Sequence, residues 1–231
     1  MESPRPLYLF GIAPDPDNAG VGNVLIMLNV FQPHRRMRLL YYGSDNMKNS
    51  HLKLRALCEG AILTAVAVVL SFLPVYRLPQ GGSFSVDMLP ILIYCVRWGF
   101  GPAMTVSTVY GILQMFIEGG VAIGWQSIIG DFVIAYAVLG VAGLFSGRKN
   151  SFFTGSVVAC TARFCVHWVV GATIWADYMP DRFFNMTMTS PWLYSALYNG
   201  SFMLADLLIC LAAGALLMKP IGKYLRGEDL A

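Results

Sequence analysis

Hydrophobic positions gather into six long apolar runs separated by short polar segments. A helix needs about 20 residues to span the ~30 Å hydrocarbon core of a bilayer. Each run is long enough, or nearly long enough, to do so; the runs cover 55–73, 86–98, 101–117, 124–145, 153–176 and 192–218. The pattern predicts an all-α, polytopic membrane protein whose domain of six transmembrane helices occupies residues 51–231.

The second and third runs are the shortest of the six. The segment Arg97–Pro102 joins them, and its Gly99, Gly101 and Pro102 indicate a tight turn. Short apolar segments in membrane proteins often line a cavity instead of facing lipid. We therefore expect a cavity near these two helices.

Lysine and arginine are unevenly distributed over the segments that join the runs. If the N-terminus is cytoplasmic, the outer loops hold only Arg77 and Arg182. The inner segments then hold Lys53, Arg55, Arg97, Arg148, Lys149, Lys219, Lys223 and Arg226. Since cytoplasmic loops are enriched in such residues, the sequence predicts a multi-pass protein of a bacterial cell membrane with both termini inside (N-in/C-in).

Composition agrees with a membrane environment. Hydrophobic residues make up 56% of the chain and charged residues 13%, against about 25% charged in a typical soluble domain. The net charge of +3 is too small to indicate nucleic-acid binding. Five cysteines lie in apolar stretches without metal-ligand spacing, and we interpret them as small apolar residues: Cys58, Cys95, Cys160, Cys165 and Cys210.

A few polar residues interrupt the last three runs. With a rise of ~1.5 Å per residue, Asp131, His167 and Asn199 each lie roughly 10–13 Å from the outer helix ends. Arg163 and Asp206 lie deeper, at roughly 18–23 Å. Because buried polar side chains in membranes usually face a cavity or a partner, the shared depth predicts a site in the outer half.

Structural interpretations of the same residues stay open. His167 on its own would be a common interhelical hydrogen-bonding residue. Arg163 would form a structural ion pair with Asp206 or Asp131, and for Asp206 we favour this interpretation over a direct role in the site.

Aromatic residues accompany the polar ones. One ridge of the fifth predicted helix carries four residues spaced by four: Arg163, His167, Gly171 and Trp175. Gly171 is expected to leave room beside the ring of His167, with Trp175 at the outer mouth; Trp192 and Tyr194 open the sixth helix. Rings above a carboxylate suit a flat, cationic, heteroaromatic ligand, although aromatic residues at the membrane boundary also act as anchors.

Three weaker signals complete the pattern. Gly81 and Gly82 let the first outer loop approach a ligand closely or bend as a lid. Ala61 and Ala65, four residues apart, let another helix pack closely in lipid. The sequence lacks the G-x-x-x-x-G-K-[ST] phosphate-binding loop and the common hydrolase and zinc motifs.

From about residue 53 to 226 the chain resembles the thiamine-specific substrate-binding (S) components of energy-coupling factor transporters. The resemblance is carried by Gly81-Gly-Ser, Leu89-Pro-Ile-Leu, Asp131-Phe, Leu139-Gly-Val-Ala-Gly-Leu-Phe, His167-Trp-Val-Val-Gly-Ala-Thr-Ile-Trp and Tyr194-Ser-Ala-Leu-Tyr-Asn-Gly. It implies the S-component fold and a substrate-binding set of Gly81, Gly82, Ser83, Asp131, Phe132, His167, Trp175, Tyr194 and Asn199. Phe132 stands where a tyrosine is often found, and Gly81 falls near the place of a tryptophan in some members.

The resemblance also implies a mode of action. S components capture thiamine from outside with high affinity, without a cofactor and without catalysing a reaction. They deliver it inward together with a transmembrane coupling subunit and two ATPase subunits. Ala61 and Ala65 match the helix 1 motif that packs on the coupling subunit, and the missing phosphate-binding loop agrees with an external energy source.

Residues 1–50 differ in kind from the rest. They mix Pro, Asp, Asn, Arg and Tyr without periodicity, and their apolar stretch 21–31 is too short to span a bilayer. The segment 13–24 looks like a translated thiamine-pyrophosphate riboswitch. We therefore interpret residues 1–50 as a disordered extension or a start-site artefact, with Met47 as the expected true start.

Three other functions stay open on the sequence. The departures at Phe132 and Gly81 leave room for an S component that binds a thiamine precursor such as hydroxymethylpyrimidine. An intramembrane enzyme would use Asp131 and His167 as an acid–base pair. A purely structural membrane subunit would bind no saturable ligand.

Overall fold

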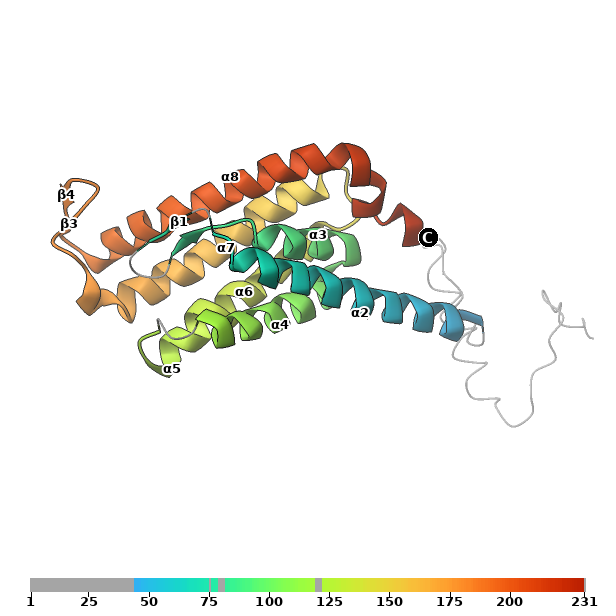
Figure 1. Ribbon diagram of the computed structural model, residues 1–231, viewed down its shortest axis with the longest axis horizontal. Coiled ribbons are helices and arrows are strands. Elements are labelled where there is room, and N and C mark those ends of the chain that lie inside the picture. The colour runs from blue at the N-terminus through green and yellow to red at the C-terminus, as the bar shows by residue number, and fades with distance from the viewer. Residues whose placement is uncertain (1–43, 75, 79–81, 119–121, 231) are drawn as a thin grey trace, which may run out of the picture. The chain divides into compact units, whose positions relative to one another are not determined.

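The computed structural model describes residues 44–74, 76–78, 82–118 and 122–230 (Figure 1). Its larger compact unit is Met47–Ala231. The interpretation of the N-terminal extension concerns residues 1–43 for the most part, which lie outside the described residues, and the start at Met47 stays a prediction.

Within the described ranges, five helical segments are long and apolar enough to cross a membrane. They are Ser50–Ser71, Phe100–Glu118, Gly124–Phe145, Ser151–Thr173 and Pro191–Met218. Four of them lie in single helices: α2 (Ser44–Ser71), α4 (Phe100–Glu118), α7 (Ser151–Thr173) and α8 (Pro191–Leu225). The prediction of an all-α, polytopic membrane protein is confirmed, with boundaries close to the apolar runs.

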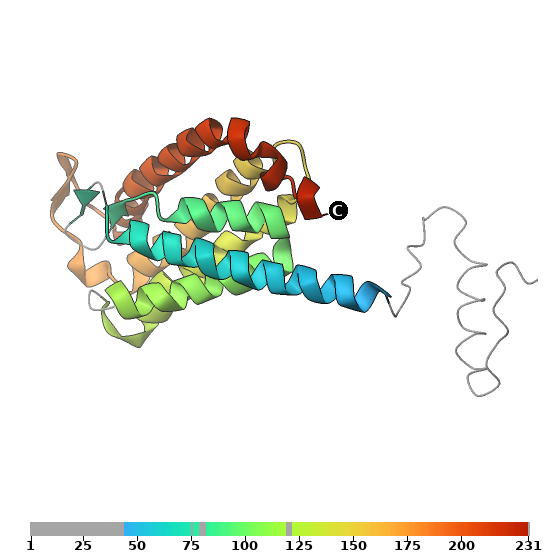
Figure 2. The ribbon, with the colours of Figure 1, turned by 45° about the vertical axis from the view of Figure 1, so that its right-hand side comes forward.

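The second predicted transmembrane helix is the short α3 (Met88–Trp98), whose 11 residues extend only about 16 Å. Every residue from Met88 to Arg97 is buried, because α3 packs against α4, α7 and α8 inside the bundle (Figure 2). Gly99, with φ 81°, makes the predicted turn into α4. The antiparallel hairpin of β1 (Tyr76–Arg77) and β2 (Ser83–Phe84) precedes α3.

The crossing at 124–145 changes its winding along its length. It consists of α5 (Gly124–Ser127), the π-helical η3 (Ile128–Ile134), α6 (Ala135–Ala137) and the 3₁₀-helical η4 (Val138–Phe145). A π-helical turn holds an extra residue and is found frequently at functional sites. Asp131 lies within this π-helical segment.

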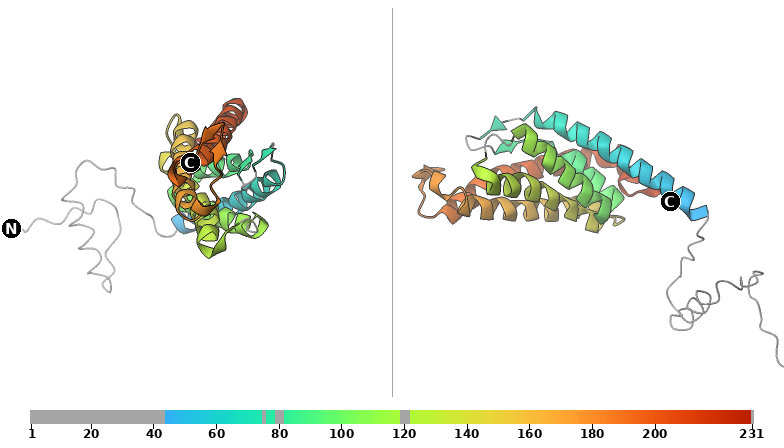
Figure 3. Two further views of the ribbon diagram at one scale, coloured as in Figure 1. Left: turned by 90° about the vertical axis from the view of Figure 1, so that its left-hand side faces the viewer. Right: turned by 90° about the horizontal axis from the view of Figure 1, so that it is seen from below.

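The two ends of the bundle differ in structure. The hairpin β3 (Arg182–Phe183)–β4 (Met186–Thr187) follows the 3₁₀ helix η5 (Ala176–Tyr178), and both lie at the end that carries β1–β2 (Figure 1). The C-terminal 3₁₀ helix η6 (Glu228–Leu230) and the beginning of α2 lie at the opposite end (Figures 1 and 3). The cytoplasmic location of that end stays a prediction.

A buried arginine holds the end that carries η6 together. The Arg97 side chain is fully buried, and its Nε donates to Glu59 Oε2 of α2 over 2.7 Å. Its Nη1 and Nη2 reach the Asp229 carboxylate over 2.7 and 2.8 Å, and Nη1 also donates to the Tyr224 carbonyl over 2.6 Å. One guanidinium thereby joins α2, α3, α8 and η6.

Candidate functional site

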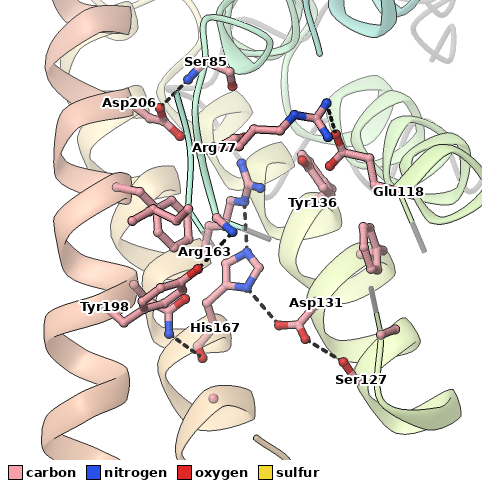
Figure 4. A pocket seen from close by; sticks show the side chains of 18 of the residues that line it. Arg77, Ser85, Glu118, Ser127, Asp131, Tyr136, Arg163, His167, Tyr198 and Asp206 are labelled. Carbon is pink, nitrogen blue, oxygen red and sulfur yellow. Dashed lines mark hydrogen bonds and ion pairs between the residues drawn. The ribbon is translucent and has the colours of Figure 1, made fainter. Parts of the chain in front are cut away.

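A cavity of about 630 Å³ opens among the β1–β2 hairpin, α4, η3, α7 and α8 (Figure 4). Its volume falls within the range of ordinary small-molecule sites. It is lined by every described residue of the substrate-binding set: Gly82, Ser83, Asp131, Phe132, His167, Trp175, Tyr194 and Asn199. Gly81 lies outside the described residues.

The carboxylate of Asp131 accepts three hydrogen bonds from side chains around the cavity. His167 Nδ1 lies 2.9 Å from Asp131 Oδ1. Trp175 Nε1 donates to Oδ2 over 3.0 Å, and Ser127 Oγ donates to the same oxygen over 2.9 Å. The predicted meeting of helices 4 and 5 at one depth is therefore present as direct contacts.

The hydrogen-bond partners of His167 favour one tautomer of its ring. A guanidinium can only donate, and Arg163 Nε approaches His167 Nε2 at 3.4 Å. His167 Nε2 is therefore the acceptor, and the ring proton lies on Nδ1 and is donated to Asp131. His167 in this arrangement is neutral, so the three donors to Asp131 are an imidazole, an indole and a hydroxyl. None of them cancels the negative charge of the carboxylate.

Asn199 joins the same group from α8. Its Nδ2 donates to the His167 carbonyl over 3.3 Å and to the Ser195 carbonyl and Oγ over 3.0 and 3.1 Å. The predicted set of Asp131, His167 and Asn199 is thus brought together from three crossings. These bonds fix the plane of the Asn199 amide at the cavity wall.

Gly171 makes the junction of α7 and α8 possible. A Cβ at this position would lie 2.4 Å from Ser195 Oγ and 3.0 Å from Asn199 Nδ2. The glycine therefore leaves room for α8. The atoms nearest to the missing side chain thus belong to α8, and Gly171 lines the same cavity as His167.

An aromatic ladder on α8 forms one wall of the cavity. Tyr194, Tyr198 and Phe202 are buried and follow one another at ring-centroid distances of 5.7 and 5.9 Å. The ring of Phe202 also lies 6.2 Å from that of His167, at 71°. Trp192 does not line this cavity: it is 46% exposed, and its carbonyl accepts from Trp168 Nε1 over 3.0 Å.

Gly82 brings the segment between β1 and β2 against this ladder. Its backbone N–H donates to Tyr198 Oη over 3.2 Å, and a Cβ would lie 2.8 Å from Phe202 Cδ1. The backbone of Gly82 therefore closely approaches α8, and its predicted approach to a ligand stays a prediction.

The cavity lining also contains charged groups that were not predicted as part of the site (Figure 4). Arg77 Nη2 of β1 lies 3.3 Å from Glu118 Oε1 at the end of α4. The guanidinium of Arg163 lies 3.9 Å from the centre of the Tyr136 ring. Asp206 Oδ1 accepts from the backbone N–H of Ser85 over 2.8 Å. Among the described residues, the favoured Arg163–Asp206 ion pair is absent, as is a pair between Arg163 and Asp131.

Some of the cavity residues that were not predicted could have been found from their spacing in the sequence. Ser127 precedes Asp131 by four residues, and Tyr198 and Phe202 follow Tyr194 at steps of four, so helical spacing alone places them on the same faces. Ser85 and Glu118 carried no such signal, because their contacts link residues far apart in the sequence. Over the described ranges, no group of three or more His, Cys, Asp or Glu side chains is arranged to hold a metal ion.

Comparison with known proteins gives a consistent result. Residues 57–225 match the thiamine transporter protein family (Thia_YuaJ). The chain is 28% identical over 199 residues to the thiamine transporter ThiT of Bacillus subtilis, covering 78% of this chain and 98% of the relative. It is 26% identical over 187 residues to ThiT of Lacticaseibacillus paracasei, covering 72% and 89%. A solved structure of ThiT from Listeria monocytogenes matches with a TM-score of 0.65 at 26% identity, over 75% of this chain and 98% of that one.

Proposed function

Because the chain belongs to the thiamine transporter protein family, we propose that it binds thiamine with high affinity from outside the cell and delivers it inward as the S component of an energy-coupling factor transporter. One observation carries the binding proposal: the Asp131 carboxylate accepts hydrogen bonds from His167, Trp175 and Ser127 in a cavity that aromatic side chains also line. Thiamine combines a permanent thiazolium cation with a flat aminopyrimidine. A carboxylate next to ring faces attracts such a cation.

The contacts of Asp131 suggest how it meets the ligand. A carboxylate has about four lone-pair sites; Oδ2 accepts two protein hydrogen bonds and Oδ1 accepts one. One site on Oδ1 is left to face the exocyclic amine, while the charge balances the thiazolium. We further propose that Trp175 and Tyr194 stack on the ligand and that His167 and Asn199 hydrogen-bond to it. Gly82, Ser83 and Phe132 complete the wall, and Gly81, which lies outside the described residues, stays a predicted member of the set.

Coupling to partners is proposed for α2. Ala61 and Ala65 are exposed on it, as are Leu57, Ile62 and Val69. A face of small and aliphatic side chains suits close helix packing within lipid. The proposed partner is the transmembrane coupling subunit, which acts with two ATPase subunits. Both termini would face the cytoplasm.

Substitution of Asp131 tests the proposed site. In the purified chain, Asp131→Asn is expected to weaken thiamine binding more than tenfold, because breaking a buried charged contact costs about 2–5 kcal/mol. Tryptophan-fluorescence titration measures the affinity. Asp177→Asn is the matched control, since Asp177 is exposed and lies outside the cavity lining. An unchanged affinity for Asp131→Asn would remove this carboxylate from the site.

The alternatives predict different results. Competition with the separate pyrimidine and thiazole halves distinguishes thiamine from a precursor, since a precursor-binding protein would prefer the pyrimidine half to intact thiamine. An intramembrane enzyme would convert the bound molecule, whereas a transporter subunit releases it unchanged. The relatives are named as transporters, which favours the second outcome.

A further inference from the structure

Ser85 is held from two sides by buried carboxylates. Its backbone N–H donates to Asp206 Oδ1 of α8 over 2.8 Å, and its hydroxyl donates to Asp87 Oδ1. Ser85 is 4% exposed, Asp87 4% and Asp206 3%. Ser85 directly follows β2, so these bonds fix the point at which the β1–β2 hairpin meets the bundle.

Asp87 is turned toward the hairpin by a second set of contacts. It occupies the N-cap position of α3, yet its side chain makes no capping hydrogen bond, although aspartate commonly caps there. Instead, Oδ2 accepts from Tyr110 Oη over 2.6 Å, and Tyr110 Oη accepts from Gln114 Nε2 over 2.5 Å. A buried chain of polar groups in α4 thus directs Asp87 toward Ser85.

The hairpin follows one ridge of α8. Gly82 contacts Tyr198 and Phe202, and Ser85 contacts Asp206. Tyr198 and Asp206 are eight residues apart on a helix, about 12 Å, and Gly82 and Ser85 are three residues apart in extended chain, about 10 Å. The two spacings nearly match, so strand and helix can be joined at both positions.

We propose that Asp206 is a positioning residue that holds the β1–β2 hairpin against the cavity by accepting a hydrogen bond from the Ser85 backbone. Its role is that of an acceptor and does not depend on its charge. This distinguishes it from an ion-pair partner of Arg163 and from a carboxylate that attracts a cationic ligand. Both of those roles require the negative charge.

Two substitutions of Asp206 distinguish the effect of its hydrogen-bond acceptor from the effect of its negative charge. Asp206→Asn retains an oxygen that accepts from Ser85, whereas Asp206→Ala removes it. Limited trypsin digestion of the purified chain reports on the hairpin, because Arg77 is exposed in β1, β1 is paired with β2, and proteolysis of a paired strand proceeds through local opening. Arg182, which is exposed in the β3–β4 hairpin, serves as an internal control in the same digest.

We expect Asp206→Ala to accelerate cleavage after Arg77 on the order of tenfold, because the buried backbone N–H of Ser85 loses its acceptor and the hairpin opens more easily. Asp206→Asn should stay within about twofold of the unsubstituted chain, and cleavage after Arg182 should be unchanged in both. Equal acceleration by both substitutions would show that charge matters and would overturn the proposal. Unchanged cleavage in Asp206→Ala, or acceleration at both arginines, would also overturn it.

The consequence for the ligand rests on the proposed function. Gly82 and Ser83 of the hairpin line the cavity, so Asp206→Ala should raise the dissociation rate of thiamine severalfold and Asp206→Asn should not. The digestion requires no ligand. If the chain fails to bind thiamine at all, the proposed function fails while the digestion still decides the role of Asp206.

Discussion

The close approach of α7 and α8 at Gly171 yields a quantitative prediction. In Gly171→Ala, the new methyl group would lie 2.4 Å from Ser195 Oγ and 3.0 Å from Asn199 Nδ2. An ordinary contact needs at least 3.4 Å, so the helices must separate or the Ser195 hydroxyl must move by roughly 1 Å. Ser195 Oγ donates to the Trp168 carbonyl over 2.8 Å and accepts from Asn199, so the strain reaches the cavity wall.

Overpacking of this kind costs about 1–3 kcal/mol, which corresponds to a fall of about 2–12 °C in transition temperature for a chain of this size. We also expect thiamine binding to weaken about tenfold, because Asn199 is displaced. Thermal unfolding of the purified protein and fluorescence titration measure the two effects. The matched control is Gly200→Ala in α8, where the nearest atom to a new Cβ is Phe164 Cε2 at 3.6 Å. That change should stabilise the helix by up to about 1 kcal/mol.

A second substitution tests the cause. Ser195→Ala removes the Oγ that would clash, so the double variant with Gly171→Ala should lose less stability than the sum of the two single variants. The expected coupling is about 1 kcal/mol or more. An unchanged transition temperature for Gly171→Ala, or additive effects of the two changes, would refute the reasoning.

Three further predictions concern α2 and the end of the bundle that carries η6. Ala61→Leu and Ala65→Leu should leave thiamine binding unchanged and abolish uptake by cells, because both residues are exposed on the proposed partner face; loss of binding would contradict that role. Arg97→Met leaves Glu59 without its buried partner and should lower the free energy of unfolding by about 3–5 kcal/mol, as measured by thermal unfolding. Adding Glu59→Met should recover part of that stability, because it removes the unpaired carboxylate. The Arg97 guanidinium holds the pKa of Asp229 below its usual range, so this carboxylate stabilises the fold above its unfolded pKa and loses that contribution as pH falls. Transition temperatures between about pH 5 and 3 should therefore decline less in Asp229→Asn, although partial exposure of Asp229 keeps the effect small.

Hydropathy and helical rise predicted much of this molecule, because both depend on local sequence. The apolar runs predicted the positions of the membrane-crossing segments. Counting ~1.5 Å per residue placed Asp131, His167 and Asn199 at one depth, and the structure shows these residues in contact. The partner of Asp206 was not predictable in this way. It is the backbone of Ser85, 121 residues away, and a backbone N–H carries no sequence signal. Pairing Asp206 with Arg163 from charge and depth alone was therefore wrong.

The π-helical turn at Asp131 shows a second limit, and it bears on how the site works. The hydropathy of an apolar run does not distinguish an α-helix from a π-helix, so the sequence of residues 124–145 predicted a uniform helix. In the structure, Ile128–Ile134 is π-helical, and the wider turn changes the direction of each side chain. Asp131 there accepts from Ser127 on its own crossing and from His167 and Trp175 on the next. Three hydrogen-bonded side chains thus orient the carboxylate, and under the proposed function its charge would meet the thiazolium cation.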